Sequence, residues 1–595
     1  MQEQATDKNT SLFALPDGVL GTVLSSAVKL KDLEQLYAAA RSGEQHSLAD
    51  SVLRLLNVRI QVADVDLQRL PASGPLVVVS NHPFGLLDGL VLIQLVSSVR
   101  KDVKVLTNAF LAGIAELRPH IIPVEVFSAE KACTANLRAV RTAMNALQSG
   151  EAIAIFPSGE VSHWRKEARR VTDPPWNPLA VRCAKATGAR LVPVYFAGEN
   201  SLTFQVAGLV HPRFRTMRLP AELLNKRNRT VDVRVGNPIS PEELAKFDSD
   251  ERATEYVRAR TYVLAHRGER KGQVSSLALP LPKLSRVCPV ADARANVPML
   301  IDELQARDAS VIETDAFTVY AERGERMPAL LDELGRLREL TFRRVGEGTG
   351  KARDIDTFDS YYTHLILWHK ARKAIAGSYR LAWTEDVLRE RGINGLYTST
   401  LFRFAPEFFE NIGPAVELGR SFIQPEFQRD FSPLLLLWQA IGRCVRTRPE
   451  APILFGAVSI SANYSEAARE MIVQFLRHRS FRYDLASLVH PRHAFRSNLL
   501  RSDELQAITE CLSEVEDLPL ADIESEPGIP VLLRQYLRLG GQLIGFNVDR
   551  NFSGVLDGLV LVDLRQTQPK LLAKYMTVEG CADFLRRSRG PSVHV

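Results

Sequence analysis

Cysteine is scarce in this chain of 595 residues, with six cysteines scattered from Cys133 to Cys581. No CxxC pair occurs, and no histidine stands near a cysteine at the spacing of a metal site. This pattern excludes a disulfide framework and a zinc module of the common kinds. We expect reduced, mostly structural cysteines and a cytoplasmic protein.

Long apolar segments are lacking as well. The longest apolar region, Gly85–Val99, is interrupted by Asp88 and Gln94. It falls short of the roughly 20 residues that a membrane-spanning helix needs. The first residues contain no basic leader followed by an apolar stretch, so we expect no signal peptide. The sequence therefore predicts a protein that is not integral to the membrane.

Basic residues outnumber acidic ones only slightly, giving a formal net charge of +6, but they gather in runs. The runs span residues 163–170, 213–229 and 258–271. Each can be a solvated helix face, or can attract an acidic carrier protein or an anionic membrane. Trp164 and Phe214 within the runs favour a membrane surface, so we expect peripheral binding to the inner face of the cytoplasmic membrane. No zinc finger, RNA-binding or helix-turn-helix pattern accompanies the runs, and nucleic acid is not an expected partner.

One segment has the composition of a linker. Residues 266–286 are charged, then small and polar, then punctuated by proline. We predict a first domain at 1–270, a linker at 271–286 and a second domain at 287–595.

Both predicted domains have an α/β pattern. In the first, apolar runs typical of strands at 76–80, 104–107, 152–156 and 190–195 alternate with helical patterns such as 130–149. In the second, we predict helices at 330–342 and 432–446, adjacent hairpin strands at 365–368 and 374–379, and a closing strand at 559–564. Alternation of this kind predicts layered α/β folds.

A candidate catalytic pair follows the first predicted strand. His82 stands at the end of that strand, and Asp88 follows six positions later. A carboxylate can fix the tautomer of a histidine and stabilise the imidazolium that forms when the ring takes a proton. Because no GxSxG motif accompanies the pair, we expect the nucleophile to be a hydroxyl of the substrate.

These residues, with Phe156–Glu160 and Val192–Val194, resemble the motifs of the glycerolipid acyltransferases, which use acyl-carrier protein or acyl-CoA as donors. The resemblance covers about residues 60–240. It implies that His82 is the base and that Asp88 orients it. It also implies a substrate site formed by Asn81, Gly85, Phe156, Pro157, Ser158, Gly159 and Glu160.

Two departures from that family bear on the acceptor. The chain has one residue more than usual between His82 and Asp88, and Gly85 can absorb it in a tight turn. The family's FPEG block reads FPSGE here, so Ser158 stands where the glutamate is usual and the carboxylate moves to Glu160. Both changes resemble the hemolysin-like branch. The alternatives are a buried structural histidine, or an inactive fold that only docks a membrane or carrier protein.

The second predicted domain carries acids and arginines at strand and turn positions. Acids can hold a cationic amino acid, and arginines can grip a carboxylate with two parallel hydrogen bonds. The residues are Arg338, Phe342, Asp356, Asp359, Arg380, Glu417 and Arg420. Taken singly, they can equally be ordinary ion pairs and turn caps.

In order, these residues match the pattern of the autoinducer-synthase and ornithine N-acyltransferase branch of the GNAT-like fold, which they resemble across about residues 310–470. The resemblance implies that Asp356, Asp359 and Arg380 bind or orient the acceptor. It implies that Glu417 and Arg420 form the paired core of the site, with Glu417 as the candidate base.

Together the halves resemble the bifunctional ornithine lipid synthases. That resemblance implies N-acylation of ornithine by the second domain and esterification of the product's 3-hydroxyl by the first, with acyl-carrier protein or acyl-CoA as donor. No cofactor is expected, because the thioester supplies the driving force. The alternatives are a glycine or glutamine lipid, or a lysophospholipid acyltransferase fused to another N-acyltransferase.

Overall fold

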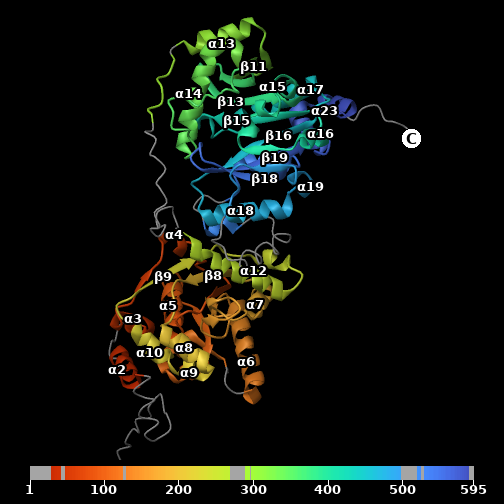
Figure 1. Ribbon diagram of the computed structural model, residues 1–595. Coiled ribbons are helices and arrows are strands. Elements are labelled where there is room, and N and C mark those ends of the chain that lie inside the picture. Colours follow the sequence, from red (N-terminus) through yellow and green to blue (C-terminus); the bar gives the residue numbers. More distant parts are fainter. Residues whose placement is uncertain are drawn as a thin grey trace, which may run out of the picture. The chain divides into compact units, whose positions relative to one another are not determined.

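The computed structural model describes residues 29–41, 47–124, 129–267, 288–294, 296–496, 519–523 and 528–588. The chain divides into two units, drawn in Figure 1. The first contains Met1–Arg267 and Leu500–Glu526, and the second contains Gly268–Leu499 and Pro527–Val595. The sequence predicted that all of 287–595 belongs to one domain, whereas residues 500–526 group with the first unit. The predicted linker, 271–286, lies outside the described residues.

A seven-stranded sheet forms the centre of the first unit. Its spatial order is β1 (Arg59–Gln61), β9 (Thr230–Val235), β8 (Arg190–Phe196), β2 (Leu76–Ser80), β5 (Ala152–Ile155), β3 (Val103–Asn108) and β4 (Ile121–Val124). Neighbouring strands are parallel except β8 and β9. The four predicted strands of this unit are confirmed.

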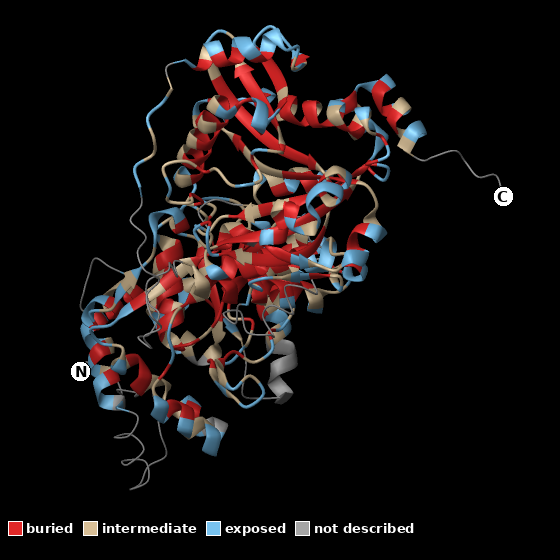
Figure 2. Ribbon diagram, turned by 45° about the horizontal axis from the view of Figure 1, so that its top comes forward, coloured by how far each residue is buried: buried red, intermediate tan, exposed pale blue. Residues whose placement is uncertain are grey.

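Helices cover both faces of this sheet. On one face Leu76 and Val78 pack in a core with α2 (Leu30–Arg41), α3 (Leu48–Leu55), α5 (Leu86–Ser97) and α10 (Leu219–Asn225). On the other, Val77 and Val79 pack with α6 (Ala129–Gln148), α7 (Leu179–Thr187) and α12 (Asp250–Val263). Since both faces are covered, all five residues of β2 are buried, and four of them are apolar. The strands at the centre of the sheets are largely red, the colour of buried residues, in Figure 2.

Smaller elements complete the first unit. They are α4 (Asp64–Leu67), η1 (Ala109–Gly113), η2 (Ala115–His120), β6 (His163–Arg165), β7 (Arg170–Thr172), α8 (Leu202–Val210), α9 (Pro212–Met217), α11 (Pro241–Ala245) and η3 (Leu264–His266).

A short segment from late in the chain also packs in this unit. It begins with η8 (Pro519–Asp522), and the Asp522 carboxylate pairs with Arg260. The same carboxylate accepts the N–H of Asn237 at 2.7 Å, and Arg267 Nε donates to the Asp522 carbonyl at 2.6 Å. Because Asp522 and Arg260 are both buried, the late segment supplies the counter-charge for an arginine of the first unit.

An eight-stranded sheet forms the second unit. Its spatial order is β10 (Ser310–Glu313), β11 (Phe317–Arg323), β12 (Thr363–His369), β13 (Ala374–Trp383), β15 (Ala415–Ile423), β16 (Ile453–Ile460), β19 (Val555–Asp563) and β18 (Gln542–Asp549). Only β15 and β16 are parallel, and their pairing stops after Glu417 and Phe455. The predicted hairpin is confirmed as β12 and β13.

Helices pack on both faces of the second sheet. Its helices and remaining strands are α13 (Val297–Ala306), α14 (Pro328–Arg344), α15 (Thr384–Arg391), β14 (Phe402–Phe404), α16 (Pro406–Ile412), α17 (Ser432–Thr447), α18 (Glu466–Arg479), α19 (Tyr483–Ala486), β17 (Val489–Pro491), α21 (Val531–Arg538), α22 (Pro569–Met576) and α23 (Val578–Ser588). The two predicted helices of this unit are confirmed as α14 and α17. The predicted last strand is β19, but α22 and α23 follow it, so this strand does not close the fold.

None of the helices in the described ranges combines the length and the apolar character that crossing a bilayer requires.

Candidate active sites

His82 and Asp88 form a hydrogen-bonded pair at the carboxyl end of β2. His82 Nδ1 lies 2.9 Å from Asp88 Oδ2, and the same oxygen accepts the N–H groups of Phe84 at 2.9 Å and Gly85 at 3.0 Å. Gly85 has a φ of 84°, and a Cβ there would lie 2.9 Å from a methyl carbon of Leu219. This position therefore needs glycine, both for its backbone conformation and for space.

The two members of the pair differ in exposure. The Asp88 side chain is fully buried, whereas His82 keeps 16% of its side chain exposed. Burial raises the pKa of the Asp88 carboxyl, while the hydrogen bonds from His82 and from the backbone favour its ionised form. Since Nδ1 faces the carboxylate, Nε2 is the ring nitrogen left to take a proton from a substrate.

The turn after β5 lies against the histidine. The Phe156 ring stacks on His82 with centroids 4.0 Å apart. The N–H of Gly159 donates to the Phe156 carbonyl at 3.0 Å, and Pro157 is buried beneath this turn. The Ser158 hydroxyl donates to a backbone carbonyl at 2.8 Å. Ser158 is therefore engaged within the turn, and Phe156 is the member of this block that touches the histidine ring.

Glu160 and Asn81 have different surroundings. The Glu160 side chain is 53% exposed and pairs with Arg215 at 2.6 Å. Asn81 is buried and exchanges two hydrogen bonds with the backbone of Phe196, at 2.7 and 2.9 Å. Asn81 thus ties the loop that carries His82 to β8.

The sequence reasoning missed Asp173. This buried carboxylate accepts the backbone N–H of His82 at 3.2 Å and the Ser162 hydroxyl through Oδ1, and the Trp176 indole N–H at 2.9 Å through Oδ2. It holds the histidine backbone from a position 91 residues later in the chain. No pattern near His82 could have indicated it.

An apolar cavity of about 540 Å³ opens beside His82. Its volume lies within the roughly 300–1,000 Å³ of ligand sites. The lining comes from α2, α3, α5, η1, η2, α9 and α10 and includes Leu36, Val52, Leu90, Ile93, Leu111, Ile114 and Leu223. His82 itself, with Gly85 and Phe156, is among the lining residues, so the cavity reaches the histidine ring.

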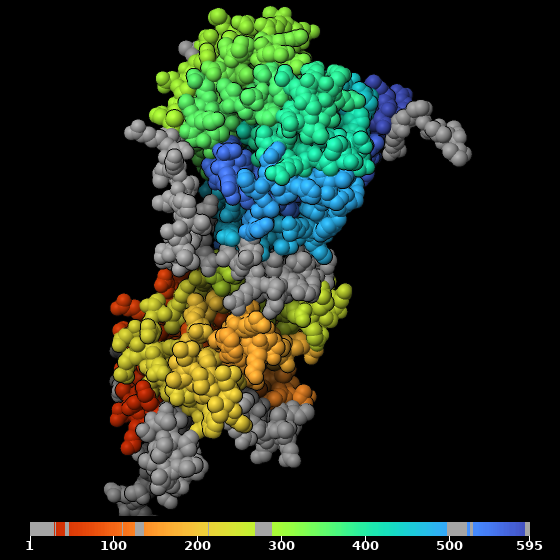
Figure 3. All heavy atoms as spheres, in the orientation of Figure 1, coloured from red at the N-terminus to blue at the C-terminus, as the bar shows by residue number. Residues whose placement is uncertain are grey.

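An apolar surface lies next to this cavity, which we call the α8 surface. It consists of Trp164, Leu202, Val206, Leu209, Val210 and Phe214, each between 42% and 79% exposed. The N–H of Trp164 donates to the Gln205 side chain at 2.9 Å, which joins the β6–β7 hairpin to α8. The segment of α8 and α9 is yellow in the space-filling view of Figure 3. Lys166 and Arg169 of the hairpin are exposed close by in the sequence, and Thr216 and Met217 of α9 line the cavity.

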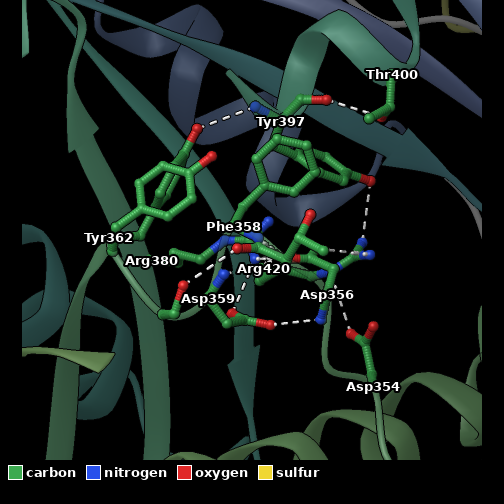
Figure 4. Close-up of polar contacts among 12 residues, drawn as sticks. Asp354, Asp356, Phe358, Asp359, Tyr362, Arg380, Tyr397, Thr400 and Arg420 are labelled. Atoms are coloured by element: carbon green, nitrogen blue, oxygen red, sulfur yellow. Dashed lines mark hydrogen bonds and ion pairs between the residues drawn. The ribbon is translucent and has the colours of Figure 1, made fainter. Parts of the chain in front are cut away.

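The second unit brings four of the predicted acids and arginines together in Figure 4: Asp356, Asp359, Arg380 and Arg420. Asp359 accepts hydrogen bonds from Arg338 at 2.6 Å and Arg380 at 2.8 Å. Asp356 accepts one from Arg380 at 2.6 Å and lies 3.7 Å from Arg420. Burial opposes the ionisation of Asp359, but the two arginines hold its pKa well below the ordinary value. Both aspartates are thus already neutralised by arginines.

Glu417 is sealed inside this site. Its carboxylate accepts the Tyr362 hydroxyl and the N–H groups of Tyr397 at 3.1 Å and Thr398 at 2.7 Å. Burial raises its pKa, although these donors favour the ionised form. The predicted pairing of Glu417 with Arg420 is wrong, because Arg420 turns to other partners.

Arg420 lies between two rings and two acids. Its guanidinium is 4.7 Å from the Tyr397 ring centroid and 4.9 Å from that of Phe552, and Nε is 3.1 Å from Asp354. Phe342 packs edge-to-face on Phe552 at 5.3 Å and therefore reaches Arg420 only through that ring. The sequence reasoning missed Asp354, although it stands two positions before Asp356.

Tyr362, Tyr397 and His364 were also missed. The Tyr362 and Tyr397 rings lie about 5 Å from the Arg380 guanidinium, and His364 Nδ1 is 3.1 Å from Arg338 Nη2. Tyr362 and His364 stand within the segment after Asp359, where a run of aromatic residues was the available signal.

Known proteins resemble both units. Residues 27–269 match a family described as "Acyltransferase", and residues 337–439 match the "Acetyltransferase (GNAT) domain" family. A glycine Nα-acyltransferase of Bacteroides thetaiotaomicron is 30% identical over 41% of this chain and 76% of its own length. The chain belongs to the family of that glycine Nα-acyltransferase. It is an acyltransferase with a mixed α/β fold.

Two further similarities concern other members of the acyltransferases. A lyso-glycine lipid O-acyltransferase of Phocaeicola vulgatus is 24% identical over 36% of this chain and 76% of its own length. The crystal structure of the 1-acyl-sn-glycerophosphate acyltransferase PlsC from Thermotoga maritima matches 40% of this chain and 83% of its own at 18% identity, with a TM-score of 0.24.

Proposed function

We propose that this acyltransferase makes an amino-acid lipid in two acyl transfers. In the second unit, a 3-hydroxyacyl group passes from acyl-carrier protein to the α-amine of an amino acid. In the first, another acyl group esterifies the 3-hydroxyl of that product. The observation that carries the proposal is the His82–Asp88 pair at an apolar cavity, in a chain whose other unit gathers a separate polar site. The names of the relatives, an N-acyltransferase and an O-acyltransferase, support it.

The O-acylation step uses the histidine pair. His82 Nε2 takes the proton of the 3-hydroxyl while the oxygen attacks the thioester carbonyl carbon. The C–S bond then breaks, and the imidazolium returns its proton to the departing thiolate. Asp88 is a positioning residue that stabilises the imidazolium. The apolar cavity takes an acyl chain with its reacting end at His82.

In the N-acylation step we propose that Glu417 is the proton acceptor. Since its oxygens are enclosed by donors, it acts through the Tyr362 hydroxyl, which donates to it. The pairing of β15 with β16 ends at Glu417 and Phe455, and we propose that the thioester arm binds beyond this point. Arg420 and Asp356, with 12% and 21% of their side chains exposed, face the acceptor side.

Ornithine and glycine are the two candidate acceptors. The sequence-based reason for ornithine was that Asp356 and Asp359 could hold its cationic side chain, but arginines occupy both. The relatives named for glycine favour glycine.

We further propose that the α8 surface contacts the lipid bilayer. Exposed apolar side chains beside basic residues suit insertion among anionic headgroups. Because α9 contributes to both the α8 surface and the cavity lining, a lyso-lipid could pass from the membrane to His82 without crossing water.

Lipid mass spectrometry tests the proposal. The full chain is expressed in a host that lacks amino-acid lipids, and extracts are analysed for mono- and diacylated amino acids. We expect a diacylated product whose headgroup fragment identifies the amino acid. Glu417→Gln should lose both the mono- and the diacylated product while the protein stays folded. Absence of any amino-acid lipid from wild-type extracts, with a folded protein and an active acyl-carrier protein, would refute the proposed function.

A further inference from the structure

A separate acidic cluster lies in the second unit, outside the motif residues. It consists of Glu347, Asp549 and Asp557, which are 8%, 9% and 5% exposed. Asp557 on β19 stands directly opposite Ser459 on β16 and Asn547 on β18. Directly opposed residues project to the same face of a sheet, and Asp549 shares that face because it is two residues from Asn547.

The cluster has few hydrogen-bond partners. The Ser459 hydroxyl donates to Glu347 at 2.8 Å, a backbone N–H donates to Asp549 at 2.8 Å, and the Asn547 side chain bonds to Asp557. The buried oxygen Oδ2 of Asp557 has no partner among the described residues. Within the same ranges, no lysine or arginine forms an ion pair with any of the three carboxyl groups.

A bound cation would stabilise the acidic cluster electrostatically. Burial, with Asp549 and Glu347 nearby, raises the pKa of Asp557 well above its ordinary value, and burial also raises the pKa of Glu347. Arg420 is near Asp557 but is already shared by Asp354 and Asp356. A cation bound beside Asp557 and Glu347 would oppose these shifts and favour the ionised form of both carboxyl groups.

An ammonium group fits this demand better than a metal ion. In the described part of the chain, no three His, Cys, Asp or Glu residues are arranged to hold a metal. An ammonium group offers three N–H donors, which suits several separate carboxyl oxygens, one of them unused. We propose that Glu347, Asp549 and Asp557 bind the ammonium group of the acceptor amino acid beside Arg420. This inference rests on the proposed function, which supplies the amino acid.

Either the α-ammonium or a side-chain ammonium of an amino acid could bind to the cluster in this way. Glycine has only the α-amine, whereas ornithine also has a side-chain amine. If the cluster takes the α-ammonium, it serves every amino acid. If it takes the side-chain ammonium, it selects cationic ones and sets the specificity of the enzyme.

The test measures KM for glycine and for ornithine in N-acylation by the full-length protein with saturating acyl donor. Asp557→Asn should raise the KM about tenfold or more, because a charge-assisted hydrogen bond is lost. A rise for both amino acids identifies the α-ammonium, and a rise for ornithine alone identifies the side-chain group. Asn resembles the protonated acid, so the melting temperature should not fall. Asp563→Asn is the matched control, because Asp563 lies on the same strand but is paired with Arg565. It should leave the KM for glycine and the KM for ornithine unchanged.

The outcomes separate this inference from the proposed function. If wild-type protein acylates no amino acid, the proposed function fails. If it does and Asp557→Asn leaves both KM values unchanged, the cluster is not the ammonium site. A second variant, Glu347→Gln, should give the same pattern as Asp557→Asn. A loss of kcat without a change in KM in both variants would also overturn the inference.

Discussion

Replacing His82 by alanine should separate the two proposed activities of this chain. The substitution removes the imidazole that lies 2.9 Å from Asp88 and 4.0 Å from the Phe156 ring centroid. No residue of the second unit's polar site lies in the same unit as His82. We therefore expect O-acylation to fail while N-acylation continues, so that the monoacylated amino acid accumulates.

The size of the effect follows from the role of the histidine. General base catalysis contributes about 10²- to 10⁴-fold to a rate, which corresponds to about 3–5 kcal/mol of transition-state stabilisation. The cost in folding stability should be only about 1 kcal/mol, because Asp88 keeps two backbone N–H donors after the substitution. The rate of O-acylation should thus fall far more than the melting temperature.

The assay follows the monoacyl and diacyl products by mass spectrometry, with purified protein, amino acid and acyl-carrier-protein thioester. His120→Ala is the control, because this histidine pairs with the Val103 carbonyl, at 3.3 Å, and is not among the described residues that line the cavity. Diacyl lipid formed at the wild-type rate by His82→Ala would refute the assignment of the base.

Burial and the nearby Arg338 lower the pKa of His364 to about 3, so the unfolded chain binds its proton more readily below about pH 6.5. The free energy of unfolding, measured in urea, should therefore fall as pH drops from 6.5 towards 3. His364→Gln should make this fall with pH less steep, and an equally steep fall in the variant would contradict the role of His364. Leu209→Asp on α8 should weaken co-sedimentation with anionic vesicles several-fold. Leu137→Asp on α6 is the control and should leave co-sedimentation unchanged, because the Leu137 side chain is 57% exposed and that of Leu209 is 58% exposed. Asp522→Ala should destabilise the first unit by about 2–4 kcal/mol, because the buried Arg260 then keeps only its longer ion pair with the partly exposed Glu243, at 3.4 Å; an unchanged melting temperature argues against the Asp522–Arg260 pair.

The first site was predictable where it is local. His82, Gly85 and Asp88 lie within one strand end and the start of one helix, so their spacing alone indicates a pair. Asp173 contacts the same loop from a distant part of the sequence, and only the tertiary fold brings it there. The cavity also depends on helices packed around one face of the sheet, which a pattern of apolar residues does not specify.

The second site was predictable as a set but not in its pairing. The order of the motif residues indicated that they gather, and they do. The pairing failed because β15 carries an extra residue relative to β13 near Arg420, whose φ is 50°. A bulge of this kind turns a side chain towards partners that sequence spacing does not reveal, here Asp354 and Asp356.

The late segment at 519–523 has a consequence for any attempt to cut this gene in two. The N- and O-acyltransferase names belong to separate proteins among the relatives, which invites expression of each half alone. A fragment ending at residue 270 would lack Asp522 and leave Arg260 and Asn237 without the carboxylate they share. A working first half would need residues 519–523 supplied as a grafted tail or an added peptide, so the fusion is more than a tether between two independent enzymes.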